Sequence, residues 1–171
     1  MIRINLVLIL MLFCRLLSAQ IISDSTAFDF WIGKWDVQWY NPDSSIGSGT
    51  NHIYKILEGN VLQENFLVED DPNLAGYEGK SWSVFNKRDY TWRQTWVDNQ
   101  TGYIEFKGVL EDNRKIFRTE IKVQGEKDLV SQMVFYNISP NSFTWDWMRS
   151  ENGGEDWELL WRIYYKRQEY H

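Results

Sequence analysis

Cysteine and histidine are nearly absent from this chain of 171 residues, which has one cysteine and two histidines. The cysteine, Cys14, lies in an apolar stretch near the N-terminus, so the rest of the chain can form no disulfide and carries no thiol nucleophile. His52 falls within an expected strand and His171 is the last residue, and two separated histidines do not supply the three or four ligands of a zinc site. We therefore expect no metal, no cofactor, and a fold held by packing alone.

A catalytic constellation is also missing. Acyl transfer needs a nucleophile with an adjacent base, and the residues after position 20 offer no such set. Glu64 and Asp98 are of the type that performs acid–base chemistry, but nothing ties their spacing to a glycosidic bond. We therefore expect no catalytic residues and no enzymatic activity.

No apolar run is long enough to cross a membrane. The first 20 residues, MIRINLVLILMLFCRLLSAQ, are mainly apolar only from Ile4 to Cys14, whereas a spanning helix needs roughly 20 apolar residues. An arginine precedes this stretch, and the small residues Ser18 and Ala19 follow it, which is the layout of a secretory signal peptide. We predict a signal peptide over residues 1–20, cleaved near Ala19 or Gln20, and a secreted or periplasmic product that does not insert into a membrane.

Basic residues are fewer than acidic ones. The chain has 18 Lys and Arg against 24 Asp and Glu; without Arg3 and Arg15 of the signal, 16 remain, and the net charge is −8. A surface of this sign repels phosphate backbones, so we expect no nucleic-acid partner.

Residues 21–171 contain no low-complexity tract or Pro-rich linker, which predicts one domain over that range. The sequence does not set an oligomeric state.

Short segments of alternating apolar and polar residues follow one another along this domain, separated by turns rich in Gly, Asn and Asp. Ten strands are predicted: Lys34–Tyr40, Thr50–Leu57, Val61–Glu69, Lys80–Asn86, Thr91–Val97, Tyr103–Leu110, Lys115–Val123, Leu129–Ile138, Ser142–Arg149 and Trp157–Arg167. Most of the turns are short, which favours consecutive antiparallel hairpins. Because closure removes the two exposed edges of such a meander, we predict an all-β, up-and-down closed barrel of about ten strands.

Tryptophan is abundant, with ten residues in the chain, and three of them lie in the stretch FDFWIGKWDVQW at residues 28–39. If Trp35 points inward, the period of two sends Val37 and Trp39 inward as well. Each buried ring removes on the order of 150 to 250 Å² from solvent. We expect these rings to plug one end of the barrel, with Phe28, Phe30 and Trp31 closing it from the preceding segment.

Gly33-Lys34-Trp35 resembles the Gly-x-Trp signature of the calycin superfamily, which includes the lipocalins and the fatty-acid-binding and nitrobindin-like proteins. With the segments GKSWSVFN, WRQTWVDNQTG and SFTWDWMRSENGGEDWELLWRIYYKR, the chain is most similar to an uncharacterised family of exported calycin-like domains. The resemblance implies that Trp35 caps the closed end of the barrel and that an arginine of the last strand covers it. Arg167 is the best match to that arginine, and Arg162 is the second.

The inner faces of the later strands follow from the same alternation and are aromatic or aliphatic apart from a few polar members. On the last strand this face comprises Trp157, Leu159, Trp161, Ile163, Tyr165 and Arg167. A mostly apolar pocket with a few polar groups is the usual make-up of a small-molecule site. The candidate ligand-binding residues are Trp35, Trp39, Glu64, Trp92, Gln94, Trp96, Trp147 and Arg149.

In this interpretation the ligand is a small apolar or amphipathic molecule. Arg149 would meet a carboxylate or another anionic head, while Trp92, Trp96 and Trp147 would flank an aromatic or aliphatic body. Glu64 and Gln94 would be further orienting groups.

A purely structural interpretation of the polar positions stays open. A buried polar group without a partner costs roughly 1 to 3 kcal/mol. Glu64 and Arg149 would then pair with each other inside the barrel. Gln94 would cap a backbone group, and Asp98 would belong to the VDNQTG turn.

Two further expectations come from the resemblance. Arg162-Ile163-Tyr164 matches the Arg-x-Tyr pair that holds the carboxylate in fatty-acid-binding relatives, but using it requires Trp161, Ile163 and Tyr165 to face outward. Nitrobindin-like relatives bind haem through a histidine on a late strand, and no histidine lies there in this chain, which argues against haem.

The loop SENGGEDW, at residues 150–157, fits an Asp-box hairpin with Asn152 in place of Asp. It occurs once, so we interpret it as a tight turn and not as a sign of a glycosidase.

The overall prediction is an exported barrel that binds a small, largely apolar ligand. The alternative is a barrel filled by its own side chains that serves as a surface interaction module, and a cavity of roughly 300 Å³ or more would favour the first.

Overall fold

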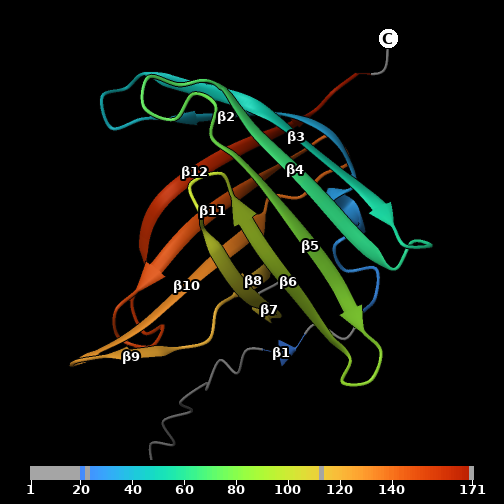
Figure 1. Cartoon of the computed structure of the whole chain (residues 1–171), viewed down its shortest axis with the longest axis vertical. Coiled ribbons are helices and arrows are strands. Elements are labelled where there is room, and N and C mark those ends of the chain that lie inside the picture. The colour runs from blue at the N-terminus through green and yellow to red at the C-terminus, as the bar shows by residue number, and fades with distance from the viewer. Residues whose placement is uncertain (1–19, 22–23, 112–113, 170–171) are drawn as a thin grey trace, which may run out of the picture.

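Ten antiparallel strands close into a barrel in the computed structural model, which describes residues 20–21, 24–111 and 114–169 (Figure 1). The elements are β1 (Gln20–Ile21), the 3-10 turn η1 (Asp29–Trp31), β2 (Gly33–Tyr40), β3 (Ile46–Ile56), β4 (Val61–Asp70), β5 (Glu78–Asn86), β6 (Thr91–Asp98), β7 (Tyr103–Glu111), β8 (Arg114–Arg118), β9 (Lys122–Gln124), β10 (Lys127–Tyr136), β11 (Ser142–Ser150) and β12 (Glu158–Arg167). The predicted fold class is confirmed. No helix within these described ranges is long and apolar enough to span a bilayer.

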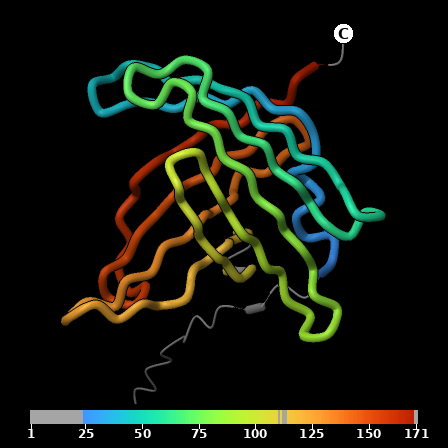
Figure 2. Tube along the Cα trace, viewed as in Figure 1, coloured from blue at the N-terminus to red at the C-terminus, as the bar shows by residue number. Residues whose placement is uncertain are grey.

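The barrel is a meander in which each wall strand pairs with its neighbour in sequence. β2 to β8 follow in order, then β10, β11 and β12, and β12 pairs with β2 to complete the ring. The predicted strand Lys115–Val123 is wrong in one respect, because it is split into β8 and β9. β9 pairs only with the start of β10, and this hairpin projects from the wall (Figure 2).

Period-two alternation sets which side chains face the interior. On β2, Trp35, Val37 and Trp39 are at most 1% exposed, whereas Tyr40 is 69% exposed, as the sequence predicts. The alternation shifts on β12, where the pairing slips between Trp147 and Met148 of β11. Leu159 is therefore 43% exposed, and its predicted place on the inner face is wrong.

The end of the barrel near η1 is filled by aromatic rings. Phe28 stacks on Phe117 with ring centroids 4.3 Å apart and meets Trp92 edge-on at 5.2 Å. Trp92 Nε1 donates a hydrogen bond to the Asp24 carbonyl at 2.8 Å, and Trp35 Nε1 donates to the Trp31 carbonyl at 2.8 Å. These bonds tie the segment before β2 into the barrel, so this end is closed.

Arg167 covers Trp35 from the last strand. Its guanidinium carbon lies 4.0 Å from the Trp35 ring centroid. The guanidinium also donates hydrogen bonds to three main-chain carbonyls, those of Pro140, Ile32 and Phe30. Its nitrogen Nη1 lies where a side chain at residue 33 would begin. Only glycine fits at that position, where φ is +142°.

The turn between β11 and β12 is tightly hydrogen-bonded. Ser150 Oγ accepts bonds from the main-chain N–H groups of Asn152 and Gly154, and Asn152 Oδ1 accepts a bond from the N–H of Asp156. Gly153 and Gly154 have positive φ values of 73° and 98°. This geometry confirms the interpretation of the Asp-box-like segment as a tight, well-satisfied turn.

We expect Arg167→Ala to lower the free energy of unfolding by about 2–4 kcal/mol, because it removes a cation–π contact and three charge-assisted hydrogen bonds. Arg167→Lys should lower the free energy of unfolding by a smaller amount, because lysine keeps the positive charge although it lacks the planar guanidinium group. Urea denaturation followed by tryptophan fluorescence measures both. Arg88→Ala, in the exposed turn between β5 and β6, is the control and should change stability by less than about 0.5 kcal/mol. Equal effects at both positions would contradict the role of Arg167.

Candidate functional site

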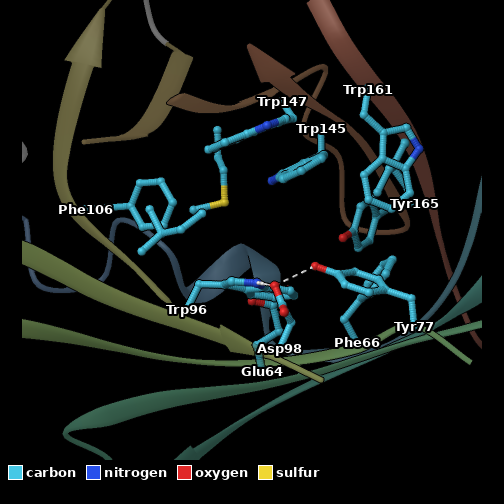
Figure 3. A pocket seen from close by; sticks show the side chains of 13 residues that line it. Glu64, Phe66, Tyr77, Trp96, Asp98, Phe106, Trp145, Trp147, Trp161 and Tyr165 are labelled. Atoms are coloured by element: carbon cyan, nitrogen blue, oxygen red, sulfur yellow. Dashed lines mark hydrogen bonds between the residues drawn. The ribbon is translucent and has the colours of Figure 1, made fainter. Parts of the chain in front are cut away.

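An aromatic chamber lies inside the half of the barrel opposite the plug (Figure 3). Its volume is about 160 Å³, and it is lined by Glu64, Phe66, Tyr77, Trp96, Asp98, Ile104, Phe106, Met133, Trp145, Trp147, Trp161, Ile163 and Tyr165. Figure 3 shows Trp145 and Trp147 of β11 across the chamber from Glu64 and Asp98. The lining is therefore four tryptophans and other apolar groups facing a small acidic floor.

A side opening in the barrel wall adjoins this chamber. Pairing of β7 with β8 covers only residues 107–111 of β7, and after Arg118 the chain leaves β7 to follow β10, where the Thr119 N–H donates to the Ser131 carbonyl at 2.9 Å. The resulting hollow has a volume of about 820 Å³ and is lined by both apolar and charged residues. It shares Ile104, Phe106 and Trp147 with the chamber, so these side chains border both spaces.

Glu64 is the most unusual group of the chamber floor. It is 5% exposed on β4 and accepts two short hydrogen bonds, from Asn51 Nδ2 at 2.7 Å and from Ser81 Oγ at 2.6 Å. Asn51 Nδ2 also donates to the Tyr165 hydroxyl at 3.1 Å, and Gln94 Nε2 donates to Ser81 Oγ at 3.1 Å. The polar chain thus runs from the chamber at Glu64 to the side opening, which Gln94 lines.

Burial raises the pKa of the Glu64 carboxyl to about 7, although the bonds from Ser81 and Asn51 act in the opposite direction. Burial also raises the pKa of Tyr165, and the nearby Glu64 adds to the effect. Two acceptors next to this group, Asn51 Oδ1 and Gln94 Oε1, are buried without a hydrogen-bond partner among the described residues. Both amides belong to the hydrogen-bonded chain that ends at Glu64, but neither is among the residues that line the chamber.

Asp98 holds the rim of the chamber in place. Its Oδ1 accepts bonds from the N–H groups of Gln100 and Gly102, as expected for a residue of the VDNQTG turn. Its Oδ2 accepts bonds from Trp96 Nε1 and the Tyr77 hydroxyl, both at 3.0 Å (Figure 3). Burial alone would raise the pKa of Asp98, but these hydrogen bonds together lower it. Asp98 is thus both a turn residue and an ionised part of the lining.

A glycine makes room for one of the tryptophans. The Trp96 ring lies directly over Gly79 of β5, at the place where a side chain at residue 79 would begin. The ring can therefore lie flat against the wall, and the space inside remains open. A larger residue at this position would push Trp96 into the chamber.

The eight candidate ligand-binding residues divide into three groups. Glu64, Trp96 and Trp147 line the chamber. Gln94 and Arg149 line the side opening, as does Trp147. Trp35, Trp39 and Trp92 are buried and line neither space; Trp39 Nε1 instead donates to Asp71 of the loop between β4 and β5, at 2.9 Å.

The expected pairing of Glu64 with Arg149 does not form. Arg149 is 43% exposed in its side chain and lies 3.4 Å from Glu151, because it is near the end of β11 and lines the side opening instead of the chamber. Gln94 donates to the hydroxyls of Ser81 and Ser83, so the expectation that it caps a backbone group is also wrong.

The Arg162-x-Tyr164 pair faces the outside of the barrel. Arg162 makes two bonds of 2.7 Å to Asp146, while Trp161, Ile163 and Tyr165 face inward and line the chamber. The fatty-acid-type carboxylate site suggested by this pair is therefore absent from the interior. His171 lies outside the described residues, and within them no group of three His, Cys, Asp or Glu side chains is placed to bind a metal ion.

Several lining residues were not among the candidates. Trp145, Trp161 and Tyr165 are on faces that the alternation correctly turns inward, so the pattern carried that signal. Tyr77 comes from a loop, and only the packing of the loop over the barrel brings it to the rim.

Comparison with known proteins adds no relative: no family model matches the chain, and no curated protein matches it.

Because the pKa of Glu64 is raised in the folded protein, the free energy of unfolding should depend on pH. The folded state binds this proton more tightly than the unfolded chain does. The resulting stabilisation is fully present below about pH 4.5 and is lost as the pH rises through about 7. We expect the wild type to lose roughly 3 kcal/mol relative to Glu64→Gln across that window.

Urea denaturation of both proteins at pH 4.5 and pH 8 measures the difference. Glu126→Gln, in the exposed turn before β10, is the control and should track the wild type at both values. A constant gap between the wild type and Glu64→Gln would show that the carboxyl is not perturbed.

Proposed function

We propose that this protein is an exported calycin-like barrel that binds a small, largely apolar molecule in its interior. The observation that carries the proposal is the aromatic chamber next to an opening in the wall. Natural small-molecule sites are concave and mostly apolar, with a few placed polar groups, and Glu64 and Gln94 supply such groups here.

The volumes bound the size of the ligand. A cavity of about 150 Å³ can hold benzene, so a chamber of about 160 Å³ has room for one ring or a branched group of that size. Alone it is smaller than the roughly 300 Å³ typical of ligand pockets. The adjoining space of about 820 Å³ accommodates the remainder of a larger molecule, so the ligand would lie across both.

Two observations support the calycin-like and exported parts of the proposal. Trp35 caps the closed end and is covered by Arg167 of the last strand at 4.0 Å, which is the arrangement that the Gly-x-Trp resemblance implies. The first 20 residues have the layout of a secretory signal.

A surface interaction module is the second candidate. Tyr40, Ile46 and Tyr164 are all exposed, and they lie together on the outer face of β2, β3 and β12. The rings of Tyr40 and Tyr164 are 6.2 Å apart, and Ile46 pairs with Tyr40 across the hairpin. Exposed apolar groups of this kind mark interaction surfaces when they are contiguous.

Ligand binding is tested with the neutral fluorescent probe N-phenyl-1-naphthylamine. Ile104 borders both the chamber and the side opening, so Ile104→Phe should narrow these spaces and weaken probe binding by about tenfold, or 1.4 kcal/mol. Leu67→Phe, which adds the same volume on the outer surface of β4, away from both cavities and from the patch of Tyr40, Ile46 and Tyr164, should bind the probe as the wild type does.

Native mass spectrometry of protein purified from its host provides the second measurement. A reproducible additional mass in the wild type, reduced in Ile104→Phe, is the expected result. No probe binding and no additional mass in the wild type would reject the ligand-binding function and favour the surface module.

A further inference from the structure

We propose that the ligand of this barrel carries a small organic cation, such as an alkylammonium group, which sits in the aromatic chamber between the tryptophan faces and the Glu64 carboxylate. This inference rests on the proposed ligand-binding function and names the chemical class of the ligand. It differs from the sequence-based expectation of an anionic head held by Arg149.

The charge of the lining favours a cation. Trp96, Trp145, Trp147 and Trp161 supply electron-rich ring faces, and cations bind to such faces with about 0.5 to 2 kcal/mol each, most strongly when water is excluded. The acidic groups of the lining are Glu64 and Asp98, and no Lys, Arg or His is found among the described residues that line the chamber. An anionic ligand group would meet two carboxyl groups and no opposite charge.

The hydrogen bonding of Glu64 leads to the same conclusion. Asn51 and Ser81 both donate to its carboxyl oxygens, which is the arrangement that stabilises the ionised form. A buried carboxylate nevertheless needs a countercharge to offset its desolvation, and the lining supplies none. A positively charged ligand group would supply the countercharge that the described lining residues lack.

Four basic residues line the side opening, and three of them are paired with acidic neighbours. Arg93, Lys107 and Arg149 pair with Asp89, Glu120 and Glu151 respectively. The fourth, Lys122, is exposed on the projecting strand β9. None of the four lines the chamber, so they do not bar a cation from it.

Choline and 3,3-dimethyl-1-butanol form a matched pair of probes, because they share shape and volume and differ by the positive charge. Choline keeps its charge at every pH, so any pH dependence of its binding comes from the protein. Calorimetry or tryptophan quenching at pH 8 should give a dissociation constant for choline at least about tenfold below that of the alcohol. The anion 3,3-dimethylbutyrate should bind more weakly than either.

Protonation of Glu64 should remove the preference for choline over 3,3-dimethyl-1-butanol. Its pKa is about 7, and the titratable groups that face it are Tyr165 on β12, Tyr77 from the loop before β5, and Asp98 at the end of β6. Neither tyrosine titrates in this range, since the pKa of each is raised, and the pKa of Asp98 is lowered. Lowering the pH from 8 to 6 should therefore weaken choline binding by about tenfold and leave the alcohol unchanged.

Two variants test the groups directly. Glu64→Gln should weaken choline binding by about tenfold and bring it to the level of the alcohol, while Glu126→Gln should match the wild type. Trp145→Leu should reduce choline binding and leave alcohol binding within about twofold. If Glu64→Gln does not fold, the pH series of the wild type and Trp145→Leu remain decisive.

The outcomes separate this inference from the proposed function. If N-phenyl-1-naphthylamine binds but choline shows no advantage over the alcohol, the cation assignment is overturned and ligand binding stands. If the preference exists but survives both pH 6 and Glu64→Gln, Glu64 is not the countercharge and the assignment is again overturned. If none of the probes binds, the ligand-binding function itself fails.

Discussion

The pairing of the last strand with the first wall strand is the interaction on which this structure depends. β12 meets β2 over four residue pairs, from Tyr164 with Gln38 to Arg167 with Trp35. This short ladder joins segments more than 120 residues apart and turns an open meander into a ring. Arg167 strengthens it at its end, since one guanidinium covers Trp35 and also bonds to carbonyls on both sides of the seam. Without closure, the alternating side chains would have no common interior.

Closure creates an interior that the chain fills unevenly. At the entry end, phenylalanine and tryptophan rings pack against each other, as the 4.3 Å contact of Phe28 with Phe117 illustrates. In the opposite half, the rings lie against the wall instead. Trp96 lies over Gly79 and is held there by its bond to Asp98. The same residue type thus makes a plug at one end and a chamber at the other, because of the small residues and polar anchors beside it.

The architecture was readable from the sequence because it rests on local signals. Alternation and turn residues predict ten strands, and the Gly-x-Trp triplet predicts the contact of Trp35 with Arg167. The site was only partly predictable. Alternation places Glu64, Trp96 and Trp147 in the lining of the chamber. It also turns Arg149 to the same side as Trp147, but Arg149 is near the end of β11, where it lines the side opening and reaches Glu151. The side opening arises because β8, which pairs with both β7 and β10, ends at Arg118, so its pairing with β7 covers only residues 107–111. No local pattern in the sequence encodes that end point.

The misplacement of Arg149 changes the chemistry assigned to the interior. With an arginine inside, the buried carboxyl of Glu64 would have its countercharge, and the chamber would be a neutral core with an internal ion pair. With Arg149 paired to Glu151, Glu64 has two donors but no cation among the described residues that line the chamber, and burial raises its pKa to about 7. A core under selection for stability alone would replace such a group with an apolar one. The presence of Glu64 in a chamber with four tryptophans, beside an opening in the wall, is explained by the proposed ligand, whose cation completes the pair.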